Sequence, residues 1–233
     1  MQKILITLVS LLGATTAAAA EPASLLIYRV VEPGIEPYIS RMIVTDDHVR
    51  LDEGADGEAY TLFDRQQEII YNVSPLDRTI LVMQPARPLP DDNEALVLQE
   101  QVKADDAAPL VAGRQPKDVR LLANGEVCSE LVVVEGVMDD AVEALSELKL
   151  VLARIQAASA EAQGPLSIQT PCELANNVYA ADRSLRFGLP IVERAGSRMQ
   201  SLVDFSTEYE ADKAMFALPN AYSRRGMNAA NAI

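Results

Sequence analysis

Few side chains in this sequence belong to the types that bind metals or act as nucleophiles. The chain has a single histidine, His48, which follows Asp46 and Asp47, so these three residues are candidate metal ligands. A zinc site needs three or four ligands at suitable spacing, and no second histidine is available. We therefore interpret residues 46–48 as a solvated turn between strands, and we predict no metal site and no cofactor.

A second candidate is the acidic, glycine-containing stretch LDEGADGEAY at residues 51–60. An EF-hand calcium loop places oxygen ligands at positions 1, 3, 5, 7, 9 and 12. Counted from Asp52, position 3 is Gly54 and position 12 is Phe63, so two required ligands are missing. Asp56-Gly57 is instead a favoured tight-turn dipeptide, because both residues tolerate positive φ. The stretch predicts a β-hairpin.

Motifs of hydrolases and nucleotide-binding proteins are absent from the sequence. A Ser-His-Asp triad could use only His48, and no G-x-S-x-G elbow presents a serine. Neither G-x-G-x-x-G nor a Walker motif occurs. Carboxylates are so numerous, at 34, that their proximity does not identify a glycosidase. We predict that the protein is not an enzyme.

The two cysteines, Cys128 and Cys172, are predicted to form a disulfide if the chain is exported to an oxidising compartment. Closing the loop from residue 128 to residue 172 would stabilise the fold by about 4 kcal/mol in the chain-entropy model. An alternative is a redox-active thiol at Cys172, which lies in the first turn of a predicted helix, where the dipole lowers a thiol pKa. No C-x-x-C pair supports this alternative, which remains the minor one.

The first twenty residues have the pattern of a secretory signal peptide. Lys3 supplies a positive charge, residues 4–20 are uncharged, and an alanine run ends before Glu21. The apolar stretch is too short to cross a bilayer comfortably, and its small residues suit cleavage after Ala20. We expect export to the periplasm, a signal peptide at residues 1–20, and no integral membrane segment in the mature chain.

Charge and composition limit the possible partners. The 233 residues carry a net charge of −14, and removing residues 1–20 takes away Lys3 and no acid, which makes the charge −15. Such a charge repels phosphate backbones, so nucleic acid is excluded as a partner. A hydrophobic content of 49% supports a substantial core. The length fits one domain over residues 21–221, followed by a flexible tail at residues 222–233.

Residues 25–83 have the pattern of six short strands with short connections, which predicts an antiparallel meander. In the fifth of these strands Ile69, Tyr71 and Val73 share one face, whereas Ile70 and Asn72 share the other. Both faces keep apolar character, so we expect this part of the sheet to be covered on each side.

The second half of the chain combines hairpin and helix signals. Asn124-Gly125 lies between two apolar runs and predicts a β-hairpin. The apolar spacing from Asp140 to Ala162 predicts one long helix. The sequence TPCE at residues 170–173 predicts the start of a short helix, with threonine as N-cap and proline at the first helical position. Two strands are expected around residues 195–197.

Several phrases of the sequence together resemble a known superfamily. These are a signal peptide, MIVTDDHVRLDEG, YTLFDRQQEIIYNVSPLDRTILV, a late helix and FALPNAY. The pattern resembles the periplasmic superfamily that includes the outer-membrane lipoprotein carrier and its small relatives. The resemblance implies an α+β fold in which a curved antiparallel sheet, an incomplete barrel, wraps around one long helix plus a short helix and can hold acyl chains. No functional residue is carried over from it.

These patterns together predict a non-enzymatic periplasmic protein that binds a lipid or acyl chain, or a hydrophobic segment of a cell-envelope partner. The alternative is an envelope protein-interaction module with no small ligand. The candidate ligand-binding residues are apolar, and core packing is the competing interpretation for them. They are Ile69, Tyr71, Val73, Ile80 and Val82 on the sheet and Leu145, Leu148 and Leu152 on the helix.

Overall fold

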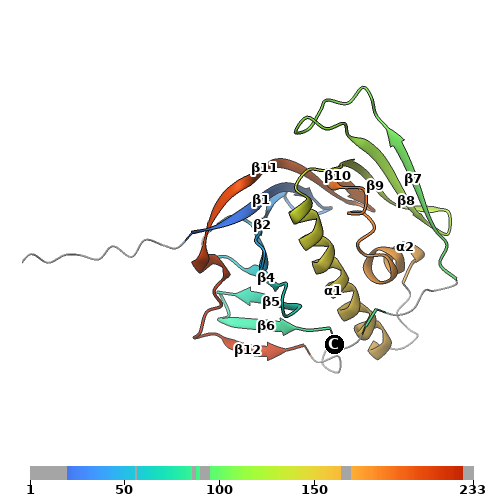
Figure 1. The fold of residues 1–233 in the computed structure, drawn as a ribbon. Helices are drawn as coiled ribbons and strands as arrows, with labels where there is room; N and C mark the ends of the chain where they lie inside the picture. Colours follow the sequence, from blue (N-terminus) through green and yellow to red (C-terminus); the bar gives the residue numbers. More distant parts are fainter. Residues whose placement is uncertain (1–19, 56, 86–87, 90–94, 164–168, 228–233) are drawn as a thin grey trace, which may run out of the picture.

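The computed structural model describes residues 20–55, 57–85, 88–89, 95–163 and 169–227 (Figure 1). These residues form a twelve-stranded sheet with the strand order β12-β6-β5-β4-β3-β2-β1-β11-β10-β9-β8-β7. The strands are β1 (Ala20–Val31), β2 (Tyr38–Val44), β3 (His48–Asp52), β4 (Tyr60–Asp64), β5 (Ile69–Ser74), β6 (Thr79–Met83), β7 (Leu98–Ala104), β8 (Lys117–Ala123), β9 (Glu126–Val134), β10 (Leu189–Ala195), β11 (Arg198–Asp212) and β12 (Ser223–Gly226).

The predicted architecture, a curved antiparallel incomplete barrel wrapped around one long helix plus a short helix, is wrong. The sheet is mixed, because β12 pairs with β6 in parallel. It is also open, since the described residues leave β12 and β7 at opposite ends of the strand order. The helices lie against this large sheet and are not enclosed by it (Figure 1). The resemblance implied a sheet that wraps around the helix, but a pattern of strands in the sequence does not specify how far the sheet curves around the helix that covers it.

The antiparallel meander predicted for residues 25–83 is confirmed, because each of β1 to β5 pairs antiparallel with the next strand along the chain. The Asn124-Gly125 hairpin is also confirmed. Both of its residues have positive φ, +51° and +81°, and they join β8 to β9. The residue types at this turn therefore predict it correctly, because asparagine and glycine are favoured where two central turn residues must adopt positive φ.

The long helix is α1 (Asp139–Gln163), close to the predicted range of Asp140–Ala162. Its buried residues pack in one cluster with side chains that point to the same face of β1 to β6, including Leu26, Val49 and Phe63. The cluster also contains Ala141, Ala144, Leu145, Leu148 and Val151 of the helix. The apolar side of α1 is therefore the main cover of this face, which we call the helix side.

The opposite face of β2 to β6 is covered by the chain that follows β11. A 3-10 turn, η2 (Lys213–Phe216), begins where the Asp212 carboxylate accepts a hydrogen bond from the backbone N–H of Ala214. Phe216 of this turn packs with Ile43, Leu62 and other strand residues in a second cluster. Both faces of β5 are thus covered, as the sequence predicts, because Ile70 belongs to the helix-side cluster and Ile69 to the second cluster.

The C-terminal end differs from the flexible tail expected at residues 222–233. Residues 223–226 form β12, and the backbone N–H of Ser223 donates to the carbonyl of Arg78 at 3.0 Å. The sequence SRRG has no apolar alternation, so only its tertiary position next to β6 makes it a strand. Residues 228–233 lie outside the described part of the chain, as do residues 1–19 of the predicted signal peptide.

Candidate functional site

A hollow of about 260 Å³ lies between α1 and the helix side of the sheet. Leu145, Leu148 and Leu152 line it from the helix, where their spacing of three and four residues places them on one face. Met42 of β2 and Leu51 of β3 line it from the sheet, and these two residues are direct cross-strand partners. The hollow, called the α1 pocket below, therefore has two mainly apolar walls.

The remaining wall of the α1 pocket comes from the segment before β10 and from the start of that strand. Leu185 and Pro190 line it and are buried. Tyr28 of β1 donates its hydroxyl hydrogen to the carbonyl of Pro190 at 2.8 Å. Burial, together with the nearby Glu193 carboxylate, raises the pKa of Tyr28 far above its ordinary value. The phenol therefore stays neutral and serves as a fixed polar group within an otherwise apolar wall.

Polar side chains gather on the lining beside these walls. Lys149 of α1 donates to the hydroxyl oxygen of the buried Ser184 at 2.9 Å. Arg198 of β11 contacts the Glu32 carboxylate at 2.9 Å and donates to the side-chain oxygen of Gln200. The amide of Gln200 in turn donates to Glu193 at 2.9 Å. Apolar walls with a few convergent polar groups are typical of small-molecule sites.

A separate open groove of about 470 Å³ lies on the sheet next to the α1 pocket. Leu51 lines both spaces, which therefore adjoin each other. Along the groove, Leu51 pairs with Thr61, Thr61 with Asn72, and Asn72 with Leu81, so these four side chains form a row across β3 to β6 on the helix side. The row is half-buried, in contrast to the buried row of Val49, Phe63 and Ile70 under the helix.

The structure separates the eight predicted ligand-binding residues into two groups. The three helix leucines line the α1 pocket. The sheet residues instead belong to the second cluster, on the face covered by η2, and do not face the helix; they are Ile69, Tyr71, Val73, Ile80 and Val82. The two groups thus lie on opposite faces of the sheet and do not share one cavity.

Sequence reasoning missed the sheet residues that do line the α1 pocket, among them Tyr28, Met42 and Leu51. The signal that could have found them is their period of two, because Tyr28 shares a face with buried Leu26 and Val30, and Leu51 shares a face with Val49. In β5 and β6 both faces are apolar, so alternation alone could not say which face meets the helix.

In the acidic stretch at residues 51–60, the carboxylate of Asp52 forms ion pairs with two arginines. Asp52 is 7% exposed and contacts the guanidinium groups of Arg41 and Arg50 at 2.7 Å each. Burial alone would raise the pKa of Asp52, but the hydrogen bonds and charges of these two arginines outweigh it and hold that pKa below its ordinary value. Within the described ranges, no group of three or more His, Cys, Asp or Glu side chains could hold a metal ion.

His48, the other candidate ligand, opens β3 and stacks on the ring of Phe216, with ring centroids 5.5 Å apart. The histidine therefore packs against η2 on the face away from the helix. Through this contact with Phe216, His48 packs at the edge of the second cluster.

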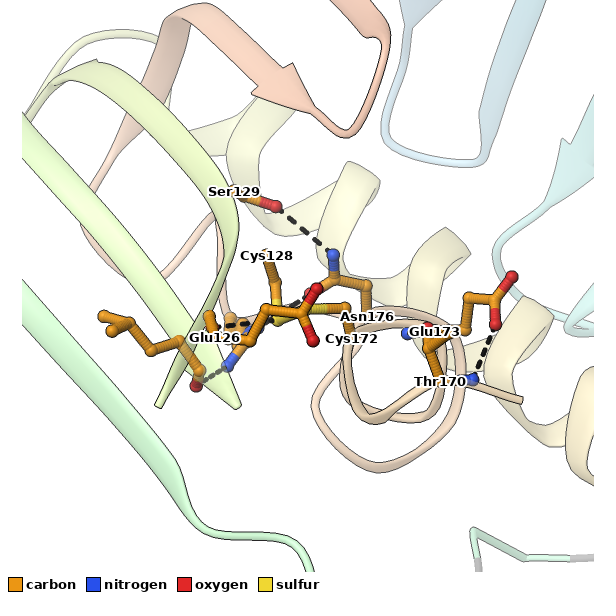
Figure 2. The surroundings of a disulfide bond; sticks show 9 residues. Glu126, Cys128, Ser129, Thr170, Cys172, Glu173 and Asn176 are labelled. Atoms are coloured by element: carbon orange, nitrogen blue, oxygen red, sulfur yellow. Dashed lines mark hydrogen bonds between the residues drawn. A yellow bond between two sulfur atoms is a disulfide. The ribbon is translucent and has the colours of Figure 1, made fainter. Parts of the chain in front are cut away.

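The predicted disulfide between Cys128 and Cys172 is confirmed, with Cα atoms 5.1 Å apart (Figure 2). It joins β9 to α2 (Pro171–Leu174). The predicted start of that helix is also confirmed. The Thr170 hydroxyl accepts from the backbone N–H of Glu173, and the Glu173 carboxylate accepts from that of Thr170 (Figure 2). Both cysteines are therefore committed to the disulfide, and Cys172 is not a free thiol.

A buried arginine holds the disulfide region together. Arg183 is 1% exposed, and it donates to the carbonyl of Leu122 at 3.0 Å and to the side-chain oxygen of Asn176 at 2.9 Å. Asn176 lies in the π-helical turn η1 (Ala175–Tyr179) and donates to the Ser129 hydroxyl (Figure 2). Burial lowers the pKa of Arg183. This network fixes the segment that carries Ser184 and Leu185 into the lining of the α1 pocket.

None of the helices in the described part of the chain is long and apolar enough to cross a membrane. No protein-family model matches the sequence, and no curated protein matches it. Among solved structures, the chain is similar to the crystal structure of an uncharacterized conserved protein from Thermus thermophilus. The TM-score is 0.46 and the identity 8%, over 88% of this chain and 90% of that one. The resemblance to lipoprotein carriers therefore stays a prediction.

Proposed function

We propose that this protein is an exported, periplasmic, non-enzymatic protein that binds an acyl chain or a similar hydrophobic segment of a cell-envelope partner. The observation that carries the proposal is the α1 pocket, an apolar hollow of about 260 Å³ between α1 and the sheet. Leu152 lines the pocket and is 42% exposed, so the pocket is accessible along the helix. Burying an apolar chain there would remove apolar surface from water on both sides.

Export is proposed from the pattern of residues 1–20 and is supported by the disulfide, since such bonds persist in oxidising compartments. Strand β1 begins at Ala20, and its pairs with β11 continue from Glu21 to Val31. Cleavage after Ala20 would thus keep nearly all of this strand. Removal of the leader is compatible with the fold of the mature chain.

Native mass spectrometry after mild purification, combined with solvent extraction, tests the proposal. We expect co-purified acyl species that leave the protein on extraction. A uniformly ligand-free mass, with no binding of added decanol, would contradict acyl-chain binding and favour the interaction module that needs no small ligand.

A variant whose side chain fills the α1 pocket should bind decanol much more weakly than the wild type. Leu152→Trp places a larger side chain at a partly exposed position, so we expect the fold to persist while the bound fraction of decanol falls at least fivefold. Val203→Trp is the matched control, because Val203 is 54% exposed on β11 and does not line the pocket. Equal decanol binding by the wild type and Leu152→Trp, measured by native mass spectrometry, would show that the ligand lies elsewhere.

A further inference from the structure

We infer, resting on the proposed function, that the preferred ligand has one hydrocarbon chain of medium length and a head with a single negative charge, as in a fatty acid. The first argument is size. A methylene group takes up about as much space as a water molecule in the liquid, about 30 Å³, so a hollow of about 260 Å³ holds roughly eight of them. The size of the α1 pocket therefore matches one hydrocarbon chain of medium length better than two such chains.

The second argument is the local charge of the pocket lining. The whole chain has a net charge of −14, so an anion is repelled by most of its surface. The charged side chains that line the α1 pocket are nevertheless two cations, Lys149 and Arg198, and one acid, Glu193. The pocket lining thus has more positive than negative side chains, although the protein as a whole is strongly acidic.

The two cations are not equivalent. Arg198 is held by the Glu32 carboxylate, so its charge is already balanced. Lys149 donates only to a neutral partner, the Ser184 hydroxyl, and among the described residues no ion pair involves it. Its ammonium has three hydrogens to donate, so it can keep Ser184 and also bind a carboxylate oxygen. A charge-assisted hydrogen bond of this kind is stronger than a neutral one.

Glu193 limits how much negative charge the head can carry. Its carboxylate accepts from the Gln200 amide and stands on the β10 side of the lining. Glu193 repels any anionic head, but it repels a head with two negative charges more strongly than a single carboxylate, whose charge the one ammonium of Lys149 balances. A chain longer than the pocket can continue past Leu51 into the adjoining groove.

Isothermal titration with three amphiphiles of equal chain length, all below their micelle concentrations, tests this inference. Decanoate should bind at least tenfold more tightly than decanol, and decylammonium should bind most weakly. Lys149→Met keeps the length of the side chain and removes its charge. It should weaken decanoate binding about tenfold, which is the effect of one charge-assisted hydrogen bond, and leave decanol binding unchanged.

Lys103→Met is the matched control, because Lys103 is an exposed lysine on β7 and does not line the α1 pocket. It should bind all three amphiphiles as the wild type does. Equal binding of decanoate and decanol by the wild type, or tighter binding of decylammonium, would overturn the anionic head while leaving the proposed function standing. An unchanged decanoate affinity in Lys149→Met would overturn the role of Lys149. If none of the three amphiphiles binds, the proposed function fails as well.

Discussion

Replacing Gly188 with alanine is expected to destabilise the protein by about 3–5 kcal/mol, from overpacking and backbone strain together. Gly188 has a φ of +109°, a conformation that residues with a Cβ rarely adopt. A Cβ at this position would lie 2.3 Å from the carbonyl oxygen of Val134 and 2.8 Å from the Cα of Glu135. These are backbone atoms of the neighbouring segment, so no side-chain rotation relieves the clash.

The position of Gly188 connects this loss of stability to the α1 pocket. The residue lies between Leu185, which lines the pocket, and β10, which begins at Leu189. Its backbone N–H donates to the carbonyl of Leu185 at 3.2 Å. A shift that makes room for a Cβ would therefore displace one wall of the pocket, and we expect weakened decanol binding in whatever fraction of Gly188→Ala folds.

Gly196→Ala is the matched control for the Gly188 experiment. Gly196 also has a positive φ, +58°, but a Cβ there would meet no atom within 4 Å. Only the cost of the left-handed conformation applies, about 1–2 kcal/mol. Urea unfolding of both variants separates the two effects. Equal losses of stability in Gly188→Ala and Gly196→Ala would contradict the close approach at Val134.

Removing the disulfide is the second change with a large expected effect. The bond closes the chain between Cys128 and Cys172, a separation of 44 residues that includes all of α1. A Cys128→Ala/Cys172→Ala double variant should lose about 4 kcal/mol of unfolding free energy, because its unfolded chain is less constrained. For a domain of this size, that loss corresponds to a fall in Tm of roughly 10 °C.

Reduction of the wild type provides an independent check on the disulfide. Dithiothreitol should lower the Tm of the wild type to about that of the double variant, and it should not change the Tm of the double variant itself. Calorimetric scans with and without reductant make the comparison. A wild type whose Tm is unaffected by complete reduction would contradict a stabilising role for this bond.

Features set by residues close together in the sequence could be predicted. The turn at Asn124-Gly125, the capping box at Thr170 and Glu173, and the periodicity of α1 each depend on a few neighbouring side chains. The disulfide followed from composition, since a chain with two cysteines has one possible intramolecular pairing. These signals were sufficient to place most strands and both α-helices.

Features set by distant parts of the chain could not be predicted in the same way. Strand β12 has the sequence SRRG, and only its parallel pairing with β6 identifies it as a strand. The site residues on β5 and β6 were assigned to the helix side, but both faces of these strands are apolar and η2 covers the face that was chosen. The buried Arg183 gave no local signal, because its acceptors, Leu122 and Asn176, come from separate elements.

NMR of methyl-labelled protein titrated with decanol shows whether an acyl chain occupies the α1 pocket on the helix side of the sheet. We expect shifts in the methyl signals that line the pocket, those of Leu51, Leu145, Leu148 and Leu152. We expect none in the signals of the opposite face, those of Ile69, Val73 and Ile80. Shifts confined to the second group, or no saturable shift at any of these methyl groups, would contradict acyl-chain binding in the α1 pocket.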